Sequence, residues 1–198
     1  MNIVTFPLGQ LQANCYLLEH EGQALLIDPG DAADFLIEKI RQKNAELVGI
    51  LATHGHFDHV MAVGELQLSY PNIPLHIHTQ DQFLLDRLTS TAEHFLGYKP
   101  IVIPIRHRTN LQKGALSIGV FSLEVIETPG HTPGSCCFYF KKEKILFTGD
   151  TLFRGAIGRN NYVYSDPKKL EQSVQHLLSL PKDTVVYPGH GEETMIGE

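Results

Sequence analysis

The sequence has few of the features that mark secreted, membrane or nucleic-acid-binding proteins. Its 198 residues include only three cysteines, Cys15, Cys136 and Cys137, and an odd count with two adjacent positions is a poor basis for a disulfide framework. No apolar run approaches the ~18 residues that a membrane span needs, and the N-terminus lacks a basic region followed by an apolar stretch. Lysine and arginine number only 16 and the net charge is -6, which disfavours a dedicated nucleic-acid binder. We therefore expect a cytoplasmic protein that binds neither membrane nor nucleic acid.

Short apolar runs bounded by glycine, proline and aspartate recur along the chain and predict strands. These runs lie at 3–6, 15–18, 24–27, 47–52, 75–77, 123–126, 136–140, 145–147 and 184–187. Periodicity predicts helices over 32–43, 60–70 and 167–180, the last with Asp166 as N-cap and Pro167 in the first helical position, and a weaker one over 79–99. No linker divides the chain. We expect a single domain over residues 1–198, a layered α/β or α+β domain with face-to-face sheets and helices outside.

Residues 53 to 59 read Thr-His-Gly-His-Phe-Asp-His, which places three imidazoles and one carboxylate within six consecutive positions. Neutral imidazole and carboxylate are ligands that zinc, manganese and iron accept. A histidine-rich polar loop is the alternative interpretation. We take His54, His56, Asp58 and His59 as candidate metal ligands, and we expect further ligands from elsewhere in the chain.

Three further candidates follow predicted strands: His131 in Thr-Pro-Gly-His-Thr, Asp150 in Thr-Gly-Asp-Thr and His190 in Tyr-Pro-Gly-His-Gly. Residues just past strand ends can converge on one rim of a sandwich, where glycine and proline turns let the backbone approach closely. Taken singly, each would more often be a hydrogen-bonded loop or turn residue. Taken with the first run, they indicate one shared site. We interpret the other histidines as structural or surface residues, namely His20, His76, His78, His94, His107 and His176.

Seven candidate ligands exceed what one tetrahedral zinc ion can use. An excess that includes a carboxylate able to bridge predicts two divalent metal ions per chain, about 3.5 to 4 Å apart. Zinc is the expected metal, with iron and manganese as alternatives. A hydroxide shared by two cations is a nucleophile near neutral pH, and the metals stabilise the oxyanion. The sequence therefore predicts hydrolysis of a carbonyl or phosphoryl centre, with Asp58 and Asp150 as catalytic carboxylates.

With these residues assembled, the chain resembles the metallo-β-lactamase superfamily. The resemblance extends from Asn14-Cys15-Tyr16 and Asp28-Pro29-Gly30 through the histidine run to His131, Asp150 and His190. It implies an αββα sandwich of class α+β, two packed mixed β-sheets flanked by helices, with the site at one edge. It also implies a division of ligands: His54, His56 and His131 on one metal, Asp58, His59 and His190 on the other, and Asp150 bridging both.

Within the superfamily, Gly149-Asp150-Thr151-Leu152-Phe153 followed by Gly158-Arg159 is most similar to the glyoxalase II group, hydrolases of S-acylglutathione thioesters such as S-lactoylglutathione. The resemblance implies hydroxide attack on the thioester carbonyl. It implies that Arg159 contacts glutathione, with a structural ion pair as the alternative. Asn161 and Glu192 stand where that group has tyrosines, so Tyr162 takes a substrate-binding role only if the loop shifts by one position. We expect no C-terminal glutathione-binding helical domain, as in short members of the group.

Other activities fit the same residues. A sulfur dioxygenase of this fold holds one iron through two histidines and one aspartate, for which His54, His131 and Asp150 would serve, and acts on glutathione persulfide. Lactone or β-lactam hydrolysis would differ only in the substrate pocket. A binding module without catalysis is the nonenzymatic alternative, although no ligand is missing. The expected partner is a small-molecule substrate, and the oligomeric state is left open.

Overall fold

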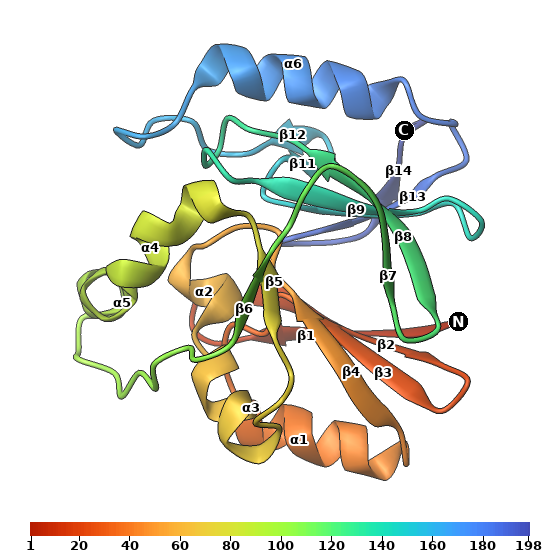
Figure 1. Ribbon diagram of the computed structural model, residues 1–198. Coiled ribbons are helices and arrows are strands. Elements are labelled where there is room, and N and C mark those ends of the chain that lie inside the picture. Colours follow the sequence, from red (N-terminus) through yellow and green to blue (C-terminus); the bar gives the residue numbers. More distant parts are fainter.

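The computed structural model describes residues 1–198 and arranges them in four layers (Figure 1). Two six-stranded sheets lie face to face in the middle. Helix α6 (Pro167–Leu178) covers the outer face of one sheet, and α1 (Ala33–Gln42) with α3 (Val63–Ser69) covers the outer face of the other. The αββα sandwich predicted from the sequence is thereby confirmed.

The first sheet is built from strands in sequential order. Its strands β1 to β3 pair antiparallel and β3 to β6 pair parallel, so the sheet is mixed. The bounds are β1 (Asn2–Leu8), β2 (Ala13–His20), β3 (Gln23–Ile27), β4 (Glu46–Leu51), β5 (Leu75–Ile77) and β6 (Arg108–Asn110). Every apolar run predicted in this part of the chain forms a strand, whereas β6 was missed because it is polar and exposed.

The second sheet has the order β14-β13-β10-β9-β8-β7. Only β10 and β13 pair parallel, and the other neighbours are antiparallel. The bounds are β7 (Gly114–Ile118), β8 (Phe121–Glu127), β9 (Cys136–Phe140), β10 (Ile145–Gly149), β13 (Val185–Pro188) and β14 (Thr194–Met195), and a separate small hairpin joins β11 (Leu152–Phe153) to β12 (Ala156–Ile157). The four remaining predicted runs overlap β8, β9, β10 and β13. The strands β7, β11, β12 and β14 were not predicted, because they are short or half-exposed and carry no apolar run.

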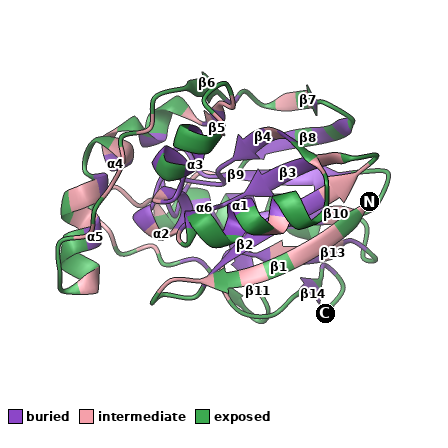
Figure 2. Cartoon of the chain, turned by 90° about the horizontal axis from the view of Figure 1, so that it is seen from below, coloured by how far each residue is buried: buried purple, intermediate pink, exposed green.

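Three apolar cores separate the four layers. Side chains alternate between the faces of a strand, so Leu17 of β2 packs against the helices and Leu18 packs between the sheets. In β9, Phe138 lies between the sheets and Tyr139 lies under α6. Figure 2 shows the buried strands behind α1. Phe147 is 0% exposed between the sheets, and its replacement by alanine would cost about 3 to 5 kcal/mol.

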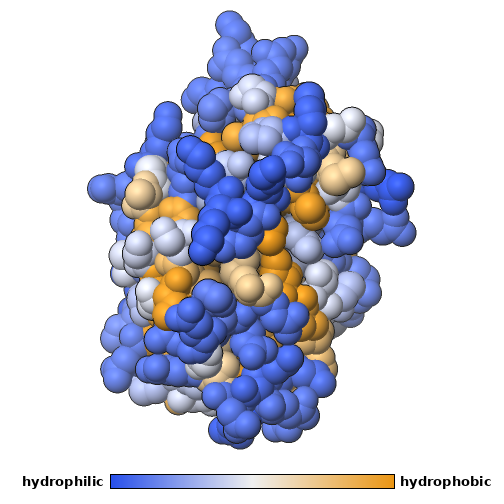
Figure 3. All heavy atoms as spheres, turned by 90° about the vertical axis from the view of Figure 1, so that its right-hand side faces the viewer, coloured by the Kyte–Doolittle hydropathy of each residue, from blue (hydrophilic) through white to orange (hydrophobic).

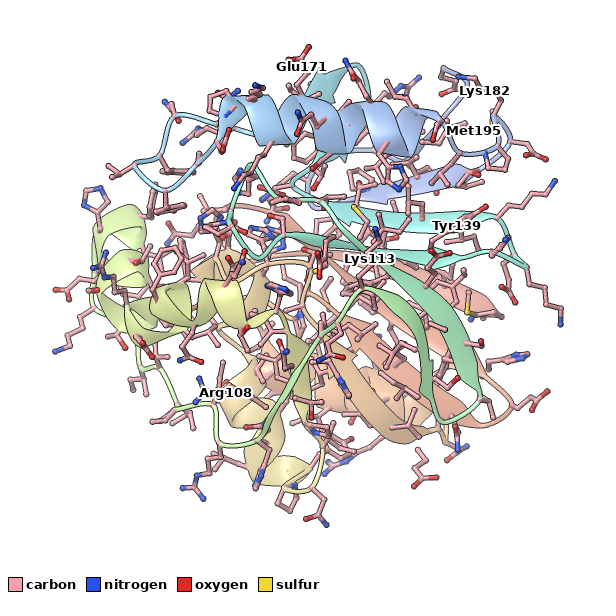
Figure 4. All side chains as sticks on the ribbon, turned by 45° about the horizontal axis from the view of Figure 1, so that its top comes forward. Arg108, Lys113, Tyr139, Glu171, Lys182 and Met195 are labelled. Atoms are coloured by element: carbon pink, nitrogen blue, oxygen red, sulfur yellow. The ribbon has the colours of Figure 1, made fainter.

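Helix α6 begins as its sequence predicts. The side chain of Asp166 accepts hydrogen bonds from the backbone N–H groups of Lys168 and Lys169, both at 3.1 Å, and Pro167 fills the first turn. These contacts satisfy N–H groups that a helix start leaves unpaired. The inner face is buried against the second sheet, and Glu171 points to solvent from the outer face (Figure 4).

The predicted helix over 60–70 was wrong at its N-terminal end. The structure has α2 (Phe57–Val60) and then α3, which begins at Val63. The N–H of Ala62 donates to the carbonyl of Pro29 at 3.2 Å, a contact outside the helix. A Cβ on Gly30 would lie 1.5 Å from the carbonyl oxygen of Asp58, so glycine lets the end of β3 press against α2.

The weaker helical prediction over 79–99 resolves into three pieces, η1 (Thr79–Asp81), α4 (Gln82–Asp86) and α5 (Leu88–Leu96). With α2 they gather on the left in Figure 1, at the edge where β3, β4, β8, β10 and β13 have their carboxyl ends. Figure 3 shows the opposite edge, where hydrophilic side chains surround smaller apolar areas.

All three cysteines are free and buried. None of the helices has the length and apolar character that a membrane crossing requires.

Candidate metal centre

The structure brings all seven predicted ligands together at that edge. Each comes from a segment that follows a strand: the loop after β4, helix α2, and the loops after β8, β10 and β13. In chain order the residues are His54, His56, Asp58, His59, His131, Asp150 and His190. The strand directions therefore account for the convergence that the sequence predicts.

Three histidines form a group that we call the imidazole cluster: His54, His56 and His131. Nδ1 of His56 lies 2.9 Å from Nε2 of His54 and 3.0 Å from Nε2 of His131. All three residues are buried. Three ring nitrogens thus converge on one small volume, with no carboxylate among them.

A second group, the mixed cluster, consists of Asp58, His59 and His190. Oδ2 of Asp58 lies 3.4 Å from Nε2 of His190 and 3.8 Å from Nε2 of His59. The side chain of His190 is 29% exposed, whereas that of His59 is 0% exposed. This cluster therefore opens toward solvent on the His190 side.

Asp150 lies between the two clusters and directs one carboxylate oxygen toward each. Its Oδ2 is 3.6 Å from Nε2 of His131 in the imidazole cluster. Its Oδ1 is 3.5 Å from Nε2 of His59 and 3.8 Å from Nε2 of His190 in the mixed cluster. This is the placement that a bridging carboxylate needs.

Backbone carbonyls set the ring orientation of two histidines. Nδ1 of His131 lies 2.7 Å from the carbonyl oxygen of Arg159, and Nδ1 of His190 lies 3.1 Å from that of Leu11. A carbonyl oxygen only accepts, so in both rings Nδ1 carries the hydrogen. Nε2 of each ring is therefore the nitrogen that faces the clusters, as a metal ligand must.

Asp28, just past β3, orients one histidine in each cluster. It accepts from Nδ1 of His59 at 2.9 Å and from the hydroxyl of Thr53 at 2.6 Å. Since the Thr53 hydroxyl donates to Asp28, its oxygen accepts from Nδ1 of His54 at 3.1 Å. Asp28, His54 and His59 lie close enough together to form a third possible ligand group. However, Asp28 contacts Nδ1 of His59 directly and Nδ1 of His54 through Thr53, and these nitrogens face away from the clusters. Sequence reasoning noted the Asp28-Pro29-Gly30 motif without assigning this role.

The loop that carries His190 is held by the other sheet. Asn14 of β2 donates from its backbone N–H to the carbonyl of Gly189 at 2.7 Å and from its side chain to Pro188 and Gly191 at 3.0 and 2.9 Å. The Tyr16 hydroxyl also donates to Pro188. A Cβ on Gly189 would lie 2.2 Å from Oδ1 of Asp150. Only glycine allows this close approach.

The two clusters differ in their affinity for protons. Burial and the neighbouring imidazoles lower the pKa of His54, and they lower that of His56 to about 3. Burial would also lower the pKa of His59, but Asp58, Asp28 and Asp150 outweigh it and raise the pKa to about 10. Burial would raise the pKa of Asp58, but His59 and His190 hold it below its usual range. His54 and His56 in the imidazole cluster are thus neutral at pH 7, and the mixed cluster is charged.

Two buried polar atoms of the site have no hydrogen-bond partner, Nε2 of His59 and Oδ1 of Asp150. Buried polar atoms are rarely left unpaired in folded proteins. These two face each other at 3.5 Å, beside further nitrogen and oxygen donors. A divalent cation would satisfy both, and imidazole with carboxylate suits zinc, iron and manganese. The residues present therefore fit metal ions.

A cavity of about 400 Å³ opens over the clusters, and both Arg159 and Tyr162 line it. The Arg159 guanidinium lies 5.8 Å from the centre of the Tyr162 ring and donates to its hydroxyl at 3.4 Å. The arginine ion pair of the structure involves Arg154 instead. Two larger hollows, of about 510 and 740 Å³, lie elsewhere and contain none of the candidate ligands.

Tyr164 lines the same cavity and was missed from the sequence. Its hydroxyl lies 2.8 Å from Nε2 of His56, and its ring stacks on that of Tyr162 with centroids 5.3 Å apart. Phe83 of α4 packs edge-on against it. No local pattern identifies a tyrosine that reaches a histidine so far away in the chain. Apolar side chains complete the wall, among them Leu11, Phe57, Phe95 and Phe153.

Comparison with known proteins identifies the family. Residues 8–190 match the metallo-beta-lactamase superfamily. The hydroxyacylglutathione hydrolase GloC of Haemophilus influenzae is 37% identical over 201 residues, which cover 100% of this chain and 94% of that protein. The crystal structure of BLEG-1 B3 metallo-beta-lactamase aligns with a TM-score of 0.89 and 37% identity, covering 99% of this chain and 95% of that one.

The crystal structure of TTHA1623 in a di-iron-bound form aligns with a TM-score of 0.88 and 38% identity, covering 100% of this chain and 96% of that one. These likenesses extend over both sheets and the edge that carries the clusters. The chain therefore belongs to the metallo-beta-lactamase superfamily, as a metal-dependent hydrolase.

Proposed function

We propose that this chain is a cytoplasmic thioesterase that hydrolyses S-acylglutathione substrates such as S-lactoylglutathione. The observation that carries the proposal is the 37% identity to the hydroxyacylglutathione hydrolase GloC over 100% of this chain. Arg159 in the cavity wall supports it, because a guanidinium is suited to the carboxylates of glutathione. Three free, buried cysteines suit a reducing compartment.

In this proposal the imidazole cluster would hold one metal, the mixed cluster would hold a second, and Asp150 would supply a ligand oxygen to each. Zinc is the expected metal, and the di-iron-bound form of TTHA1623 makes iron the first alternative. When bound, a pair of divalent cations makes water a nucleophile near neutral pH and stabilises negative charge on a carbonyl oxygen.

The carboxylates Asp58 and Asp150 act as the catalytic residues that orient the attacking water. Both side chains are largely buried, at 15% and 14% exposure, and each faces the space between the clusters. Addition of the water oxygen to the carbonyl carbon and cleavage of the C–S bond release an acid and a thiol. A thiol with a pKa of about 8.5 leaves without a strong general acid. The reaction therefore needs no such acid in the pocket.

Tyr164 has a role in substrate binding beside Arg159 and Tyr162. If Nδ1 of His56 binds a metal, Nε2 of that neutral ring must carry the hydrogen and donate to the Tyr164 oxygen at 2.8 Å. The hydrogen of the Tyr164 hydroxyl is then free to donate to the acyl carbonyl of the substrate.

The test is turnover of S-lactoylglutathione by purified protein that has been stripped with a chelator and reloaded with zinc, manganese or iron. We expect loss of the thioester absorbance and release of free glutathione with at least one metal. An absence of turnover at millimolar substrate with every metal contradicts the proposal. A thioester of a small neutral thiol is the matched control, because it keeps the scissile bond and removes the group that Arg159 would bind.

A second candidate function is β-lactam hydrolysis, favoured by the 37% identity and TM-score of 0.89 with BLEG-1 B3 metallo-beta-lactamase. The apolar wall of the cavity suits a bicyclic substrate as well as an acyl chain. The same metal-loaded preparations, assayed with a cephalosporin, decide between the two. A larger kcat/KM for the cephalosporin than for S-lactoylglutathione would favour the second candidate.

A further inference from the structure

Asp81 is a buried carboxylate that lies outside both clusters. It ends the short helix η1 after β5 and is 0% exposed. The ion pairs that involve lysine or arginine all lie elsewhere. Burial raises the pKa of Asp81. Because a carboxylate buried without a cation is costly, its presence calls for a reason beyond the filling of space.

The hydrogen bonds of the Asp81 carboxylate all lead to the two loops that carry the imidazole cluster. Oδ2 accepts from the N–H of Gly55 at 2.9 Å and from the hydroxyl of Thr132 at 2.7 Å. Oδ1 accepts from the N–H of Gly134 at 2.7 Å. Gly55 lies between His54 and His56, and Thr132 directly follows His131.

The fit around the Asp81 carboxyl group is tight. A Cβ on Gly134 would lie 2.8 Å from both the Asp81 carboxyl carbon and Oδ1, and a Cβ on Gly55 would lie 3.1 Å from the Asp81 Cβ. The Gly55 loop follows β4 of the first sheet, and the loop with Thr132 and Gly134 joins β8 to β9 of the second. One side chain therefore ties the ends of two different sheets.

We propose that Asp81 is a positioning residue that sets the spacing of His54 and His56 relative to His131. The imidazole cluster has ligands from both sheets, and any sliding of one sheet over the other would separate them. Three hydrogen bonds to a single carboxylate oppose that movement. Asp81 makes no contact with the mixed cluster, whose histidines are held by Asp28 and by the carbonyl of Leu11.

The proposal rests on the proposed metal binding at the imidazole cluster, and it predicts a selective defect. Asp81→Asn keeps the volume of the side chain. Its NH₂ group must then face at least one of the three donors, which are the N–H of Gly55, the hydroxyl of Thr132 and the N–H of Gly134, so at least one hydrogen bond is lost. We expect the affinity of the imidazole cluster for zinc to fall about 10- to 100-fold, as for other residues that orient metal ligands. The affinity of the mixed cluster should change by less than about threefold.

The experiment is a chelator-competition titration of stripped protein with zinc, which yields a dissociation constant for each metal. Anomalous scattering from crystals grown at limiting zinc identifies the emptied cluster. Asp86→Asn is the matched control, because Asp86 is an exposed aspartate on α4 whose carboxylate accepts a hydrogen bond from Gln82 of the same helix. It should titrate like the wild type.

Thr132→Val provides a second, milder variant, since it removes one of the three donors and preserves the shape of the side chain. It should weaken the same cluster in the same selective way, and it decides the question if Asp81→Asn does not fold. Equal weakening of both clusters, or a lowered melting temperature of the stripped protein with unchanged zinc affinities, overturns the proposal. So does a wild type with no zinc at the imidazole cluster. Selective loss in the two variants, together with a wild type that leaves thioesters intact, would support the role of Asp81 and refute the thioesterase.

Discussion

The imidazole cluster and the mixed cluster lie side by side, yet they are built by different physical means. In the first, burial and the neighbouring imidazoles keep His54 and His56 neutral, so their lone pairs are available at pH 7. In the second, the three aspartates Asp58, Asp28 and Asp150 surround the buried His59 and hold a proton on it. Asp150 faces both clusters with different oxygens.

The difference shows how one edge of a sandwich can carry two metals of unlike environment. A cation entering the imidazole cluster displaces no proton from His54 or His56, because the pKa of each is lowered. A cation entering the mixed cluster must displace the proton on His59, but it gains the negative charge of Asp58 and Asp150. The two affinities should therefore respond differently to pH and to substitution.

The largest effect should follow removal of the residue that the clusters share. In Asp150→Asn, the amide cannot present two anionic oxygens, and we expect kcat to fall roughly a thousandfold, equivalent to about 4 kcal/mol of transition-state stabilisation. Steady-state kinetics with S-lactoylglutathione measure it. Asp183→Asn, at an exposed aspartate paired with Lys144, is the control. A kcat within tenfold of the wild type would show that the clusters work separately.

Acid and alkali should destabilise the metal-free protein through different clusters. The pKa of His59 is about 10 in the folded chain and about 6.5 when unfolded, so its stabilisation is complete below pH 6.5 and is lost as the pH rises to 10. The pKa of His56 is about 3, so the unfolded chain gains a proton first and stability falls as the pH drops below about 6.5.

The free energy of unfolding, measured with urea on stripped protein between pH 4 and 10, should therefore be greatest at about pH 6.5. It should decline by roughly a few kcal/mol on the alkaline side. His59→Gln should abolish that alkaline decline. His176→Gln, at an exposed position on α6, should retain it. A stability curve for the wild type that is flat from neutral to alkaline pH would refute the charge difference between the clusters.

Metal addition should raise the melting temperature, because the folded chain alone offers assembled clusters. Zinc at about 100 times its dissociation constant adds roughly 2.7 kcal/mol per site, which corresponds to about 5 to 10 °C for a chain of this length. Calorimetry checks it. In His56→Gln and in Asp58→Asn, zinc should produce only part of this shift, since one cluster remains in each. An unchanged shift in either variant would remove that residue from the ligand set.

On the pocket side of the imidazole cluster, Arg159 contributes a carbonyl to His131 and a guanidinium to the cavity. Arg159→Gln preserves the carbonyl and removes the charge. We expect KM for S-lactoylglutathione to rise about tenfold with kcat nearly unchanged, a loss of about 1.4 kcal/mol of binding. The thioester of a neutral thiol should show no such rise. Equal effects on both substrates would assign Arg159 a structural role.

The smallest effect separates two stacked tyrosines. Tyr164→Phe removes the hydroxyl that contacts His56, and we expect kcat to fall about three- to tenfold. Tyr162→Phe removes a hydroxyl that contacts Arg159 instead, and kcat should change by less than about twofold. Parallel kinetics of the pair provide the measurement. The reverse ranking would place the substrate carbonyl nearer to Tyr162.

Local sequence patterns predicted the long strands and most helices, because apolar alternation and capping act over a few residues. Helix α6 with Asp166 and Pro167 is the clearest case. The strands that were missed, such as β6 and β14, have only three and two residues and are strands because they pair with β5 and β13. The broken helix between Val60 and Val63 had no local signal either, since its cause is the distant carbonyl of Pro29.

The seven candidate ligands were recognisable because histidine and aspartate after apolar runs are unusual in such number. Asp81 and Tyr164 were not, and Asp28 had no assigned role. Each acts through a partner that is distant in the sequence: Asp28 on His59, Asp81 on two loops, and Tyr164 on His56. A hydrogen bond between distant segments leaves no periodicity, so composition and spacing could not reveal it.

By itself, the sequence determined which donor atoms are present and that they follow strands, because those properties belong to residue identity and to local backbone preference. Tertiary structure alone decided which nitrogen of each ring faces inward and which aspartate lies between the clusters. It also decided which aspartates orient histidines instead. Those outcomes depend on distances of a few ångströms between two sheets, and only the packing of their apolar faces sets such distances.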